Sequence, residues 1–597
     1  MPNLVTTAAT SVGALDSGSI TSGFGTIDTG SSNITTTGVG AFGSLDISGD
    51  IDVDGTTNLD AVDVDGAVNF AADVTFADGA DIITASAGTS NFRAGVNAGN
   101  SIQSGGNFNT VLGDEAGTAI TTGDDNVAVG YAAGDAMTTG SYNAIVGKNS
   151  GGAITTGVEN VSVGWNSLDA LTEGGQNVAL GASALGSDTL GSRSVAVGYQ
   201  ALTTQNFTTA TDAHNTAVGY KAGEAVTTGA NNTIIGANTG IALTSGSNNN
   251  LIGGLAGDAL TTGHSNNIMG VSCGTALTDA DYNVAIGQQA LNSDTLGSQT
   301  VAIGSFALSA QNYTTATNSL NTAVGYAAGA AITTGDQNAL IGGLAGDALT
   351  VGRRNTAIGV STLSTDTKGD LSVAIGFGAL DTQNFTTSTE TDNTAVGAFA
   401  GLGVTSGLSN TLIGTNAGDT ITTGDFNCIV GADSDTSIAN AQARMVLGFG
   451  VSNPTDNSVR IGAGGNFISN TFTSNATWAH SSDERLKENI QNDTLGLSFI
   501  KDLRPVTFTW KKQEDVPEEL KSRFEKDTGT HHGIIAQEVK AALDTAGVSD
   551  FTGWSSDEGT GTQLVSESMF VYPLIKSVQE LSTALDAALA RIAVLEG

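Results

Sequence analysis

The sequence has very little proline, cysteine, aromatic residue or positive charge. Of its 597 residues 5 are proline, 2 are cysteine and 5% are aromatic, whereas 81 are glycine. Abundant glycine without proline, and without a strict three-residue period, excludes collagen. Two cysteines, Cys273 and Cys428, cannot form a disulfide framework and are expected to be free thiols. The scarcity of aromatics predicts a thin core of small side chains.

Positive charge is scarcest in the longer part of the chain. Residues 1–481 carry 9 lysines and arginines against 39 acids, and residues 482–597 carry 12 against 20. The net charge of −38 opposes contact with phosphate backbones and anionic membranes, so we expect no nucleic-acid partner and no membrane insertion. The sequence has no run of 18 apolar residues, and its start does not resemble a signal peptide.

A five-residue phrase, Asn-x-Ala-Val/Ile-Gly with variations, recurs from residue 109 onward. It occurs as NVAVG at 126–130 and as NTAIG at 355–359. Its last residue, which we call the marker glycine, occurs 21 times between Gly113 and Gly462, at sixteen intervals of 17 residues, three of 21 and one of 14. So persistent a short period predicts a β-solenoid with one coil per repeat. At about 4.8 Å per coil, the array spans on the order of 100 Å.

Alternation within the phrase predicts which side chains point inward. In one coil Val127 and Val129 should face one side of a strand and Ala128 the other. Asn126, at the start of the phrase, can stack in a ladder with its equivalents and satisfy backbone groups of the turns. A Thr-Thr-Gly turn follows at 138–140, where glycine can supply a positive φ.

The three intervals of 21 residues contain an aromatic residue among amides and hydroxyls. Phe207, Tyr313 and Phe385 each follow the preceding marker glycine by nine residues. Extra residues in a solenoid form loops on one face, so these rings are candidate receptor-contact residues that could stack on a sugar. The alternative is a hydrophobic plug that ties the loop to its coil or to a neighbouring chain.

The recurring phrase resembles the N-S-V-A-I-G head repeats of trimeric autotransporter adhesins, over about residues 109–462. This resemblance implies a left-handed parallel β-roll assembled as a trimer. The coil here is longer than the commoner adhesin coil, and the secretion signal and membrane anchor of that family are not expected. The cell-surface location of the adhesins is therefore not carried over.

Residues 1–95 are rich in glycine, serine, threonine and aspartate, and their alternation predicts a thin β-stalk. The polarity of the chain makes this end the candidate attachment site. Asp50, Asp52 and Asp54, followed by Gly55, imitate the start of a calcium loop. No glutamate stands at the twelfth position of such a loop, so we expect no metal and no cofactor.

The composition changes at Ser482, where the 17-residue period has ended and ordinary globular composition begins. The terminal residues predict a coiled-coil helix over about 571–597 because apolar residues recur at spacings of four and three. This heptad seam consists of Leu574, Val578, Leu581, Leu585, Ala588, Ile592 and Leu595.

A hydroxyl and an amine lie five residues apart at this boundary. Ser482 is a candidate nucleophile and Lys487 a candidate base, which requires desolvation or nearby cations to favour the neutral amine. Arg485 is expected to supply such a cation, and Asp483 to oppose it or to orient the loop. The alternative is a helix entry capped by Ser482, with its charged neighbours on a solvated face.

Three ordered signals resemble the self-cleaving intramolecular chaperone domain of phage tail fibres and tailspikes. They are Ser-Asp-x-Arg-x-Lys-x-x-Ile at 482–490, the phrase Gly-Ile-Ile-Ala-Gln-Glu-Val at 533–539, and the terminal helix. The resemblance implies trimerisation, templated folding of the preceding β-structure and one proteolytic cut. Mapped onto this sequence, the cut falls between Ser481 and Ser482.

The sequence thus predicts a mostly β, trimeric tail fibre or tailspike. We expect a β-solenoid over 96–465, a linker over 466–481 and an α+β auto-peptidase chaperone domain over 482–597. The expected partners are two further copies of the chain, a host-surface glycan or protein receptor, and phage tail or baseplate proteins. We expect the protein to be made in the host cytoplasm and carried on the virion. The alternatives are a glycan depolymerase, for which no carboxylate pair stands out, and a bacterial surface adhesin.

Overall fold

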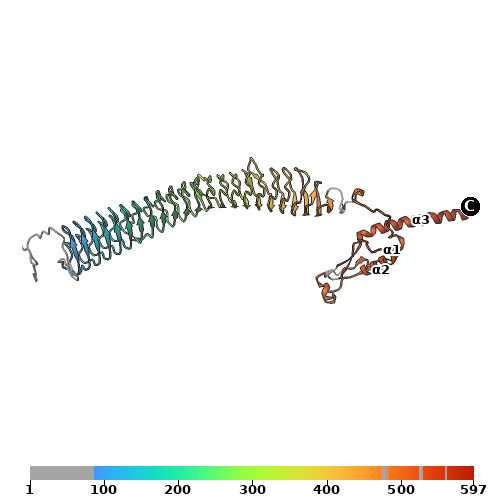
Figure 1. The fold of residues 1–597 in the computed structure, drawn as a ribbon, viewed down its shortest axis with the longest axis horizontal. Helices are drawn as coiled ribbons and strands as arrows, with labels where there is room; N and C mark the ends of the chain where they lie inside the picture. Colours follow the sequence, from blue (N-terminus) through green and yellow to red (C-terminus); the bar gives the residue numbers. More distant parts are fainter. Residues whose placement is uncertain (1–85, 473–478, 481, 524–528, 558–560) are drawn as a thin grey trace, which may run out of the picture. The chain divides into compact units, whose positions relative to one another are not determined.

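The computed structural model describes residues 86–472, 479–480, 482–523, 529–557 and 561–597. Most of the expected N-terminal stalk, residues 1–85, lies outside this part of the chain, as do Asp50, Asp52 and Asp54. The described residues belong to one unit, Ile82–Gly597. They contain a parallel β-solenoid and a small C-terminal region that ends in a helix (Figure 1).

Each solenoid coil contributes one short strand that ends immediately before its marker glycine. Neighbouring coils pair in parallel at the 17-residue interval, as Val127 with Ala144, which confirms the predicted coil. The strands of this sheet are β1 Phe92–Ala94, β2 Thr110–Leu112, β3 Val127–Val129, β4 Ala144–Val146, β5 Val161–Val163, β6 Val178–Leu180, β8 Val195–Val197, β10 Thr216–Val218, β11 Thr233–Ile235, β12 Asn250–Ile252, β13 Asn267–Met269, β14 Val284–Ile286, β16 Val301–Ile303, β18 Thr322–Val324, β19 Ala339–Ile341, β20 Thr356–Ile358, β22 Val373–Ile375, β24 Thr394–Val396, β25 Thr411–Ile413 and β26 Cys428–Val430.

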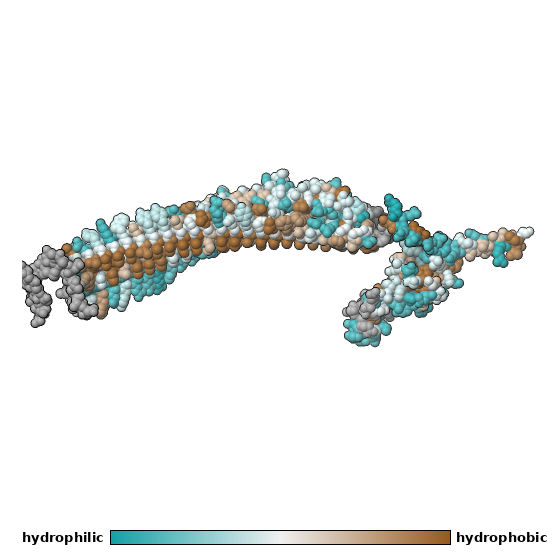
Figure 2. Space-filling view, viewed as in Figure 1, coloured by the Kyte–Doolittle hydropathy of each residue, from teal (hydrophilic) through white to brown (hydrophobic). Residues whose placement is uncertain are grey.

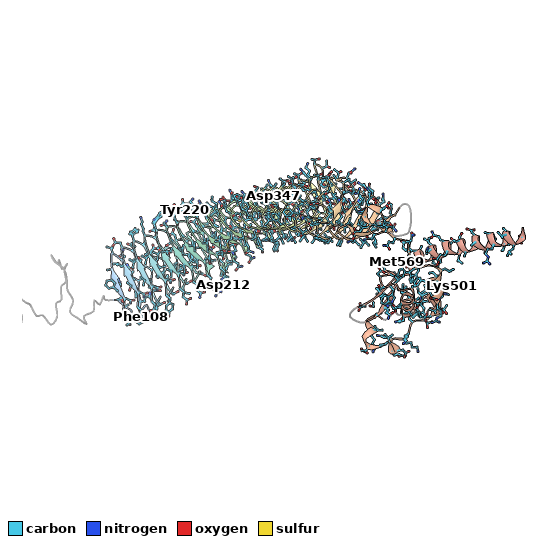
Figure 3. The ribbon with its side chains drawn as sticks, turned by 45° about the vertical axis from the view of Figure 1, so that its right-hand side comes forward. Phe108, Asp212, Tyr220, Asp347, Lys501 and Met569 are labelled. Carbon is cyan, nitrogen blue, oxygen red and sulfur yellow. The ribbon has the colours of Figure 1, made fainter. Side chains whose placement is uncertain are left out.

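Each of the three coils of 21 residues adds a second short strand. This strand pairs in parallel with a short strand of the preceding coil, which gives three such pairs. They are β7 Gly191–Ser192 with β9 Thr211–Asp212, β15 Gly297–Ser298 with β17 Thr317–Asn318, and β21 Gly369–Asp370 with β23 Thr389–Glu390. In Figure 3 Asp212, the last residue of β9, and Tyr220, two residues beyond β10, lie on opposite edges of the stack.

The solenoid core lies inside the coils and is made of small and aliphatic side chains. Ala128, the middle residue of β3, is completely buried, as are Ile145 in the next coil and Met137 on the opposite wall. Val127, by contrast, is exposed on the outer side of the sheet. This arrangement confirms the predicted alternation, and it explains why the core needs so few aromatic residues.

A ladder of buried asparagines runs along the start of the strands. The Oδ1 atom of Asn109 accepts hydrogen bonds from the backbone N–H and the side-chain amide of Asn126, both at 3.0 Å. The side-chain amide of Asn126 also donates to the carbonyl of Gly140 at 2.9 Å. Each asparagine thereby satisfies backbone groups of two coils, as the repeated phrase predicted.

The marker glycines are required by the close approach of successive coils. At Gly342 φ is +136°, and a Cβ atom would lie 2.2 Å from the carbonyl oxygen of Gly359. Neither the backbone conformation nor the contact accommodates a side chain. The recurrence of glycine at this position is therefore a packing requirement.

The solenoid extends beyond the predicted limits at both ends. Strand β1 already pairs with β2, so the array includes residues before the predicted start at 96. The stretch expected to be a linker, 466–481, contributes a strand that folds back antiparallel on the last coil. The strands at this end are β27 Asp435–Thr436, β28 Arg444–Phe449, β29 Ser452–Asn453, β30 Ser458–Ala463, β31 Asn466–Thr471 and β32 Ala479–His480.

The C-terminal region packs three helices and two small antiparallel sheets around its own core. Phe499 and Phe570 stack in this core, with ring centroids 6.2 Å apart. The elements are η1 Glu484–Leu486, α1 Leu497–Asp502, β33 Val506–Phe508, η2 Gln513–Asp515, η3 Glu518–Arg523, β34 His531–Gly533, α2 Ala536–Ala546, β35 Trp554–Ser556, β36 Gln563–Val565, η4 Glu567–Phe570 and α3 Val571–Glu596. Among the described residues, no helix combines the length and apolarity needed to span a membrane.

Helix α3 holds the predicted heptad seam away from the core of its own region. Its inward contacts come from Pro573 and Ser577, which are buried, and from Glu580, whose carboxylate accepts a hydrogen bond from the backbone N–H of Leu497 at 2.7 Å. All seven seam residues, by contrast, are exposed in the single chain. The seam is therefore available to another helix.

Candidate functional site

The structure brings the predicted nucleophile and base into direct contact. The Nζ atom of Lys487 donates a hydrogen bond to the Oγ atom of Ser482 at 2.7 Å. The single 3-10 turn η1 lies between the two residues and folds the chain back so that they meet. This distance is within the range expected for a nucleophile and its base. Ser481, on the other side of the predicted cut, lies outside the described residues.

Asp483, rather than Ser482, caps the turn between the two residues. Its carboxylate accepts a hydrogen bond from the backbone N–H of Arg485 at 2.9 Å. The same carboxylate receives the guanidinium of Arg485 through two further bonds, at 3.0 and 2.6 Å. This bidentate contact lowers the pKa of the Asp483 carboxyl and raises the pKa of Arg485. The predicted cap at Ser482 is thus replaced by Asp483, which leaves the serine hydroxyl for the lysine.

The pairing also changes the expected role of Arg485. Its guanidinium pairs with Asp483, whereas the sequence predicted it as a cation acting on Lys487. Asp483 and Arg485 therefore hold the shape of the turn in the single chain. The sequence analysis did not predict this ion pair, because the direction of the guanidinium depends on the turn itself.

The site lies open to solvent in the single chain. Ser482 and Lys487 are both exposed. Two apolar side chains beside them, Leu486 and Ile490, are 75% and 64% exposed. Apolar and polar side chains thus lie together on one exposed surface at this site.

The rings predicted as receptor contacts are buried in their coils. Phe207, Tyr313 and Phe385 are 7%, 6% and 8% exposed, and the hydroxyl of Tyr313 donates to the carbonyl of Gly335 at 2.7 Å. The exposed residues of the first of these loops are 208–210. A buried ring offers almost no face to a sugar, and its burial matches the alternative of a plug that ties the loop to its coil.

Each of these loops also carries a buried polar cluster that the sequence did not reveal. The carboxylate of Asp188 accepts hydrogen bonds from the N–H groups of Gly191 and Phe207, at 3.0 and 3.1 Å, and from the amide of Gln205. Gln205 in turn accepts a bond from the ladder residue Asn215 at 2.8 Å. Asp294 with Gln311, and Asp366 with Gln383, repeat the arrangement. The inserted glutamine thus takes the place of an asparagine that the ladder lacks at this coil.

Aromatic pairs flank the same three coils, and all their rings are exposed except Phe306, which is partly buried. The rings of Tyr199 and Tyr220 stack with centroids 5.6 Å apart and planes inclined by 13°. Phe306 lies 6.0 Å from Tyr326, and Phe377 lies 5.1 Å from Phe399. In every pair, one ring follows the marker glycine before the extra residues and the other follows the marker glycine after them. Each ring follows its marker glycine by one or two residues, a recurrence that could have been noticed in the sequence.

Metal-ligand geometry is absent from the described part of the chain. No group of three or more histidine, cysteine, aspartate or glutamate side chains there is arranged to hold an ion. Cys273 is buried, and burial raises the pKa of its thiol to about 12. Cys428 lies on the outer side of its strand and is partly exposed. Both are free thiols, as predicted.

Comparison with known proteins identifies the C-terminal segment. Residues 482–548 match the Peptidase_S74 family model, described as chaperone of endosialidase. This family is a self-cleaving intramolecular chaperone domain. No curated protein and no solved structure matches the chain. The matched segment begins at Ser482, and a β-solenoid followed by such a domain fits a tail fibre or tailspike with a C-terminal chaperone.

Proposed function

We propose that this protein is a phage tail fibre or tailspike whose C-terminal domain assembles three copies and then cuts its own chain between Ser481 and Ser482. One observation carries the proposal: the contact of 2.7 Å between the Lys487 amine and the Ser482 hydroxyl, at the first residues of a segment that matches a self-cleaving chaperone family. The reaction is a single turnover on the chain's own backbone.

Ser482 supplies both the attacking hydroxyl and the backbone nitrogen that leaves. In the proposed reaction Oγ attacks the carbonyl carbon of Ser481, and an ester bond forms as the peptide C–N bond breaks. The neutral amine of Lys487 takes the hydroxyl proton and delivers it to the leaving nitrogen. Water then hydrolyses the ester, which leaves a carboxylate on Ser481 and restores the hydroxyl of Ser482.

In this proposal, assembly of the copies removes water from around the Lys487 amine. An ammonium group in water donates hydrogen bonds and cannot accept a proton, so the lysine becomes a base only when desolvation favours its neutral form. The exposed Leu486 and Ile490 offer another copy an apolar surface beside the amine. Cleavage would then follow assembly and mark a chain that has folded correctly.

The cut is tested by expressing the full chain beside its Ser482→Ala and Lys487→Ala variants. Denaturing gels and intact mass should show the wild type as two fragments, residues 1–481 and 482–597, and both variants as one chain. Wild-type protein that stays whole, or a variant that still divides at 481/482, contradicts the proposed pair.

We propose that the protein is made in the host cytoplasm and carried on the virion. We also propose that the solenoid contacts a host-surface glycan through the aromatic pairs. Aromatic faces stack on sugar rings, and Tyr220 and Tyr326 are 51% and 60% exposed. The double variant Tyr199→Ala/Tyr220→Ala should lower adsorption to host cells. Tyr131→Ala removes an exposed ring that belongs to none of the aromatic pairs in the described part of the chain, and it is the control. Equal adsorption of the double variant and wild type would contradict this receptor site.

A further inference from the structure

The outer side of the solenoid sheet carries one unbroken row of aliphatic side chains. The residue before each of the 21 marker glycines is valine, isoleucine, leucine or methionine, without exception. None of these residues is buried, and Leu112, Met269 and Ile341 are 43%, 41% and 41% exposed. We call this set the outer row. Figure 2 shows a continuous hydrophobic band along the coils.

The strand residues beside the outer row carry no charge either. The first residue of each three-residue strand in the main sheet is threonine, valine, alanine, asparagine or cysteine from β2 to β26. A β-sheet face that meets water normally carries polar and charged side chains. An uncharged, aliphatic face of this length, in a chain of net charge −38, indicates that the face is covered in the assembled protein.

A second copy of the chain is the occupant that fits this face. Two strongly acidic chains repel each other, and the uncharged face is where they can approach without bringing carboxylates together. A partner must also match ridges that repeat at the coil spacing of about 4.8 Å, and another solenoid of the same sequence does so. A face about 100 Å long and about 10 Å wide offers roughly 1,000 Å² per copy, above the roughly 800 Å² that a standard interface buries on each side.

The same uniformity leaves the axial register undetermined. When one copy slides by a single coil, valine still meets valine or isoleucine, and nearly every contact of the outer row is restored. Something other than the outer row must align the copies. The seam of α3 can align the copies because its residues, such as Leu581 and Leu585, are exposed. The seam occurs at one position in the chain, whereas the outer row repeats in every coil.

We propose that copies of this chain pack along the outer row in register, and that the register is imposed from the C-terminal helix rather than by the solenoid. The inference rests on the proposed assembly by the C-terminal domain and goes beyond it. The C-terminal domain aligns the first coils that pair, and the remaining coils then pair one after another along the outer row. The outer row cannot correct an error in the axial register. Fibres would otherwise form as mixtures of slipped species.

The chain contains its own reporter of register. Cys428, at the start of β26, points to the outer side of the sheet and is partly exposed. Cys273 is completely buried, so we expect it not to react with a maleimide in the folded chain. In copies aligned in register the Cys428 side chains stand at the same height, whereas slippage by several coils separates them by about 5 Å for every coil.

The experiment cross-links the full chain with a short bismaleimide and measures its mass in solution by analytical ultracentrifugation. The wild type should give Cys428-linked chains that persist in Cys273→Ser and disappear in Cys428→Ser. The double variant Ile341→Asp/Ile358→Asp should lose the oligomer through repulsion on the outer row. Its control, Thr334→Asp/Ser406→Asp, places the same charges on exposed turn residues and should remain oligomeric. The proposed interface is overturned if the outer-row variant has the same mass in solution as the wild type. It is also overturned if the wild type is oligomeric but forms no cross-link through Cys428.

The role of α3 in setting the register is tested separately, with substitutions in the helix. Leu581→Asp/Leu585→Asp disrupts the seam and should lower the Cys428 cross-link several-fold, whereas Thr583→Asp/Ala590→Asp, on the far side of the same helix, should not. An unchanged cross-link in the seam variant overturns the role of the helix. Cleavage is scored on the same gels, so protein that cross-links without being cut refutes the Ser482–Lys487 pair and leaves the interface standing.

Discussion

The Nζ atom of Lys487 lies 2.7 Å from the Oγ atom of Ser482, across a turn that Asp483 caps and Arg485 closes. The contact is present in the single chain, between residues on either side of η1. Under the proposed mechanism, cleavage also requires a change in the surroundings of the amine. This division between geometry and activation leads to the first prediction.

Lys487→Arg should assemble like the wild type and fail to cut. Arginine keeps the positive charge and the hydrogen-bond donors, but it does not lose its proton in a protein. The loss of a general base slows such a reaction by about 10²–10⁴-fold. The rate is measured by following the 482–597 fragment on denaturing gels after synthesis.

Arg485→Lys is the matched control for that variant. It retains an ion pair with Asp483 and removes nothing from the Ser482–Lys487 contact, so it should cut. Cleavage by Lys487→Arg at the wild-type rate would show that the amine is not the base.

Gly342→Ala should destabilise the solenoid, and Gly343→Ala should not. A Cβ atom at Gly342 meets the backbone of the next coil and the left-handed backbone costs about 1–2 kcal/mol on its own, whereas nothing lies within 4 Å of a Cβ atom at Gly343. Thermal unfolding monitored by circular dichroism compares the two. Equal midpoints for these neighbouring substitutions would contradict the packing requirement assigned to the marker glycines.

Asn283→Ala should weaken the solenoid more than loss of an exposed amide does. The side chain of Asn283 donates to the carbonyl of Gly297 and accepts from the N–H of Thr300, both at 2.9 Å, in a fully buried position. Each buried backbone group left without a partner costs about 1–3 kcal/mol. Gln288→Ala, at an exposed position five residues away, is the control in denaturant unfolding. Similar midpoints would show that the ladder contributes little.

The last coils should lose stability as the pH rises through about 6. Burial, reinforced by the neighbouring Asp419, raises the pKa of Asp435 from 3.8 to about 6. Because the folded state holds this proton more tightly than the unfolded state, the stability gained is fully present below pH 3.8 and is lost as the pH passes about 6.

Hydrogen exchange of residues 414–448, corrected for intrinsic rates, measures this effect at pH 4.5 and pH 7. Asp435→Asn should flatten the pH dependence, and Asp392→Asn, at an exposed position, should leave it unchanged. The same pH dependence in wild type and Asp435→Asn would rule out this carboxyl as its source.

The sequence predicted most of the solenoid because its repeats are local. Seventeen residues between marker glycines determine which strand pairs with which, and alternation determines that Ala128 points inward and Val127 outward. The burial of Phe207 was not predictable in this way. Its surroundings depend on Asp188 and Gln205, which lie in a different part of the extended coil and meet only after it closes.

The candidate site was predicted in part for the same reason. Five residues of separation allow Ser482 and Lys487 to meet across one turn, and they do. The preference of Arg485 for Asp483 depends on the direction of side chains within that turn, which spacing does not determine. The antiparallel return of β31 on the last coil carries no repeat signature at all, and a linker was predicted there.

The most direct test of the account is the N-terminal residue of the small fragment released by the purified full chain, determined by intact mass and by sequencing. The account predicts a fragment that begins at Ser482 and ends at Gly597, formed by the wild type and absent from Ser482→Ala. A fragment that begins elsewhere, or one that Ser482→Ala also releases, would contradict self-cleavage by this pair.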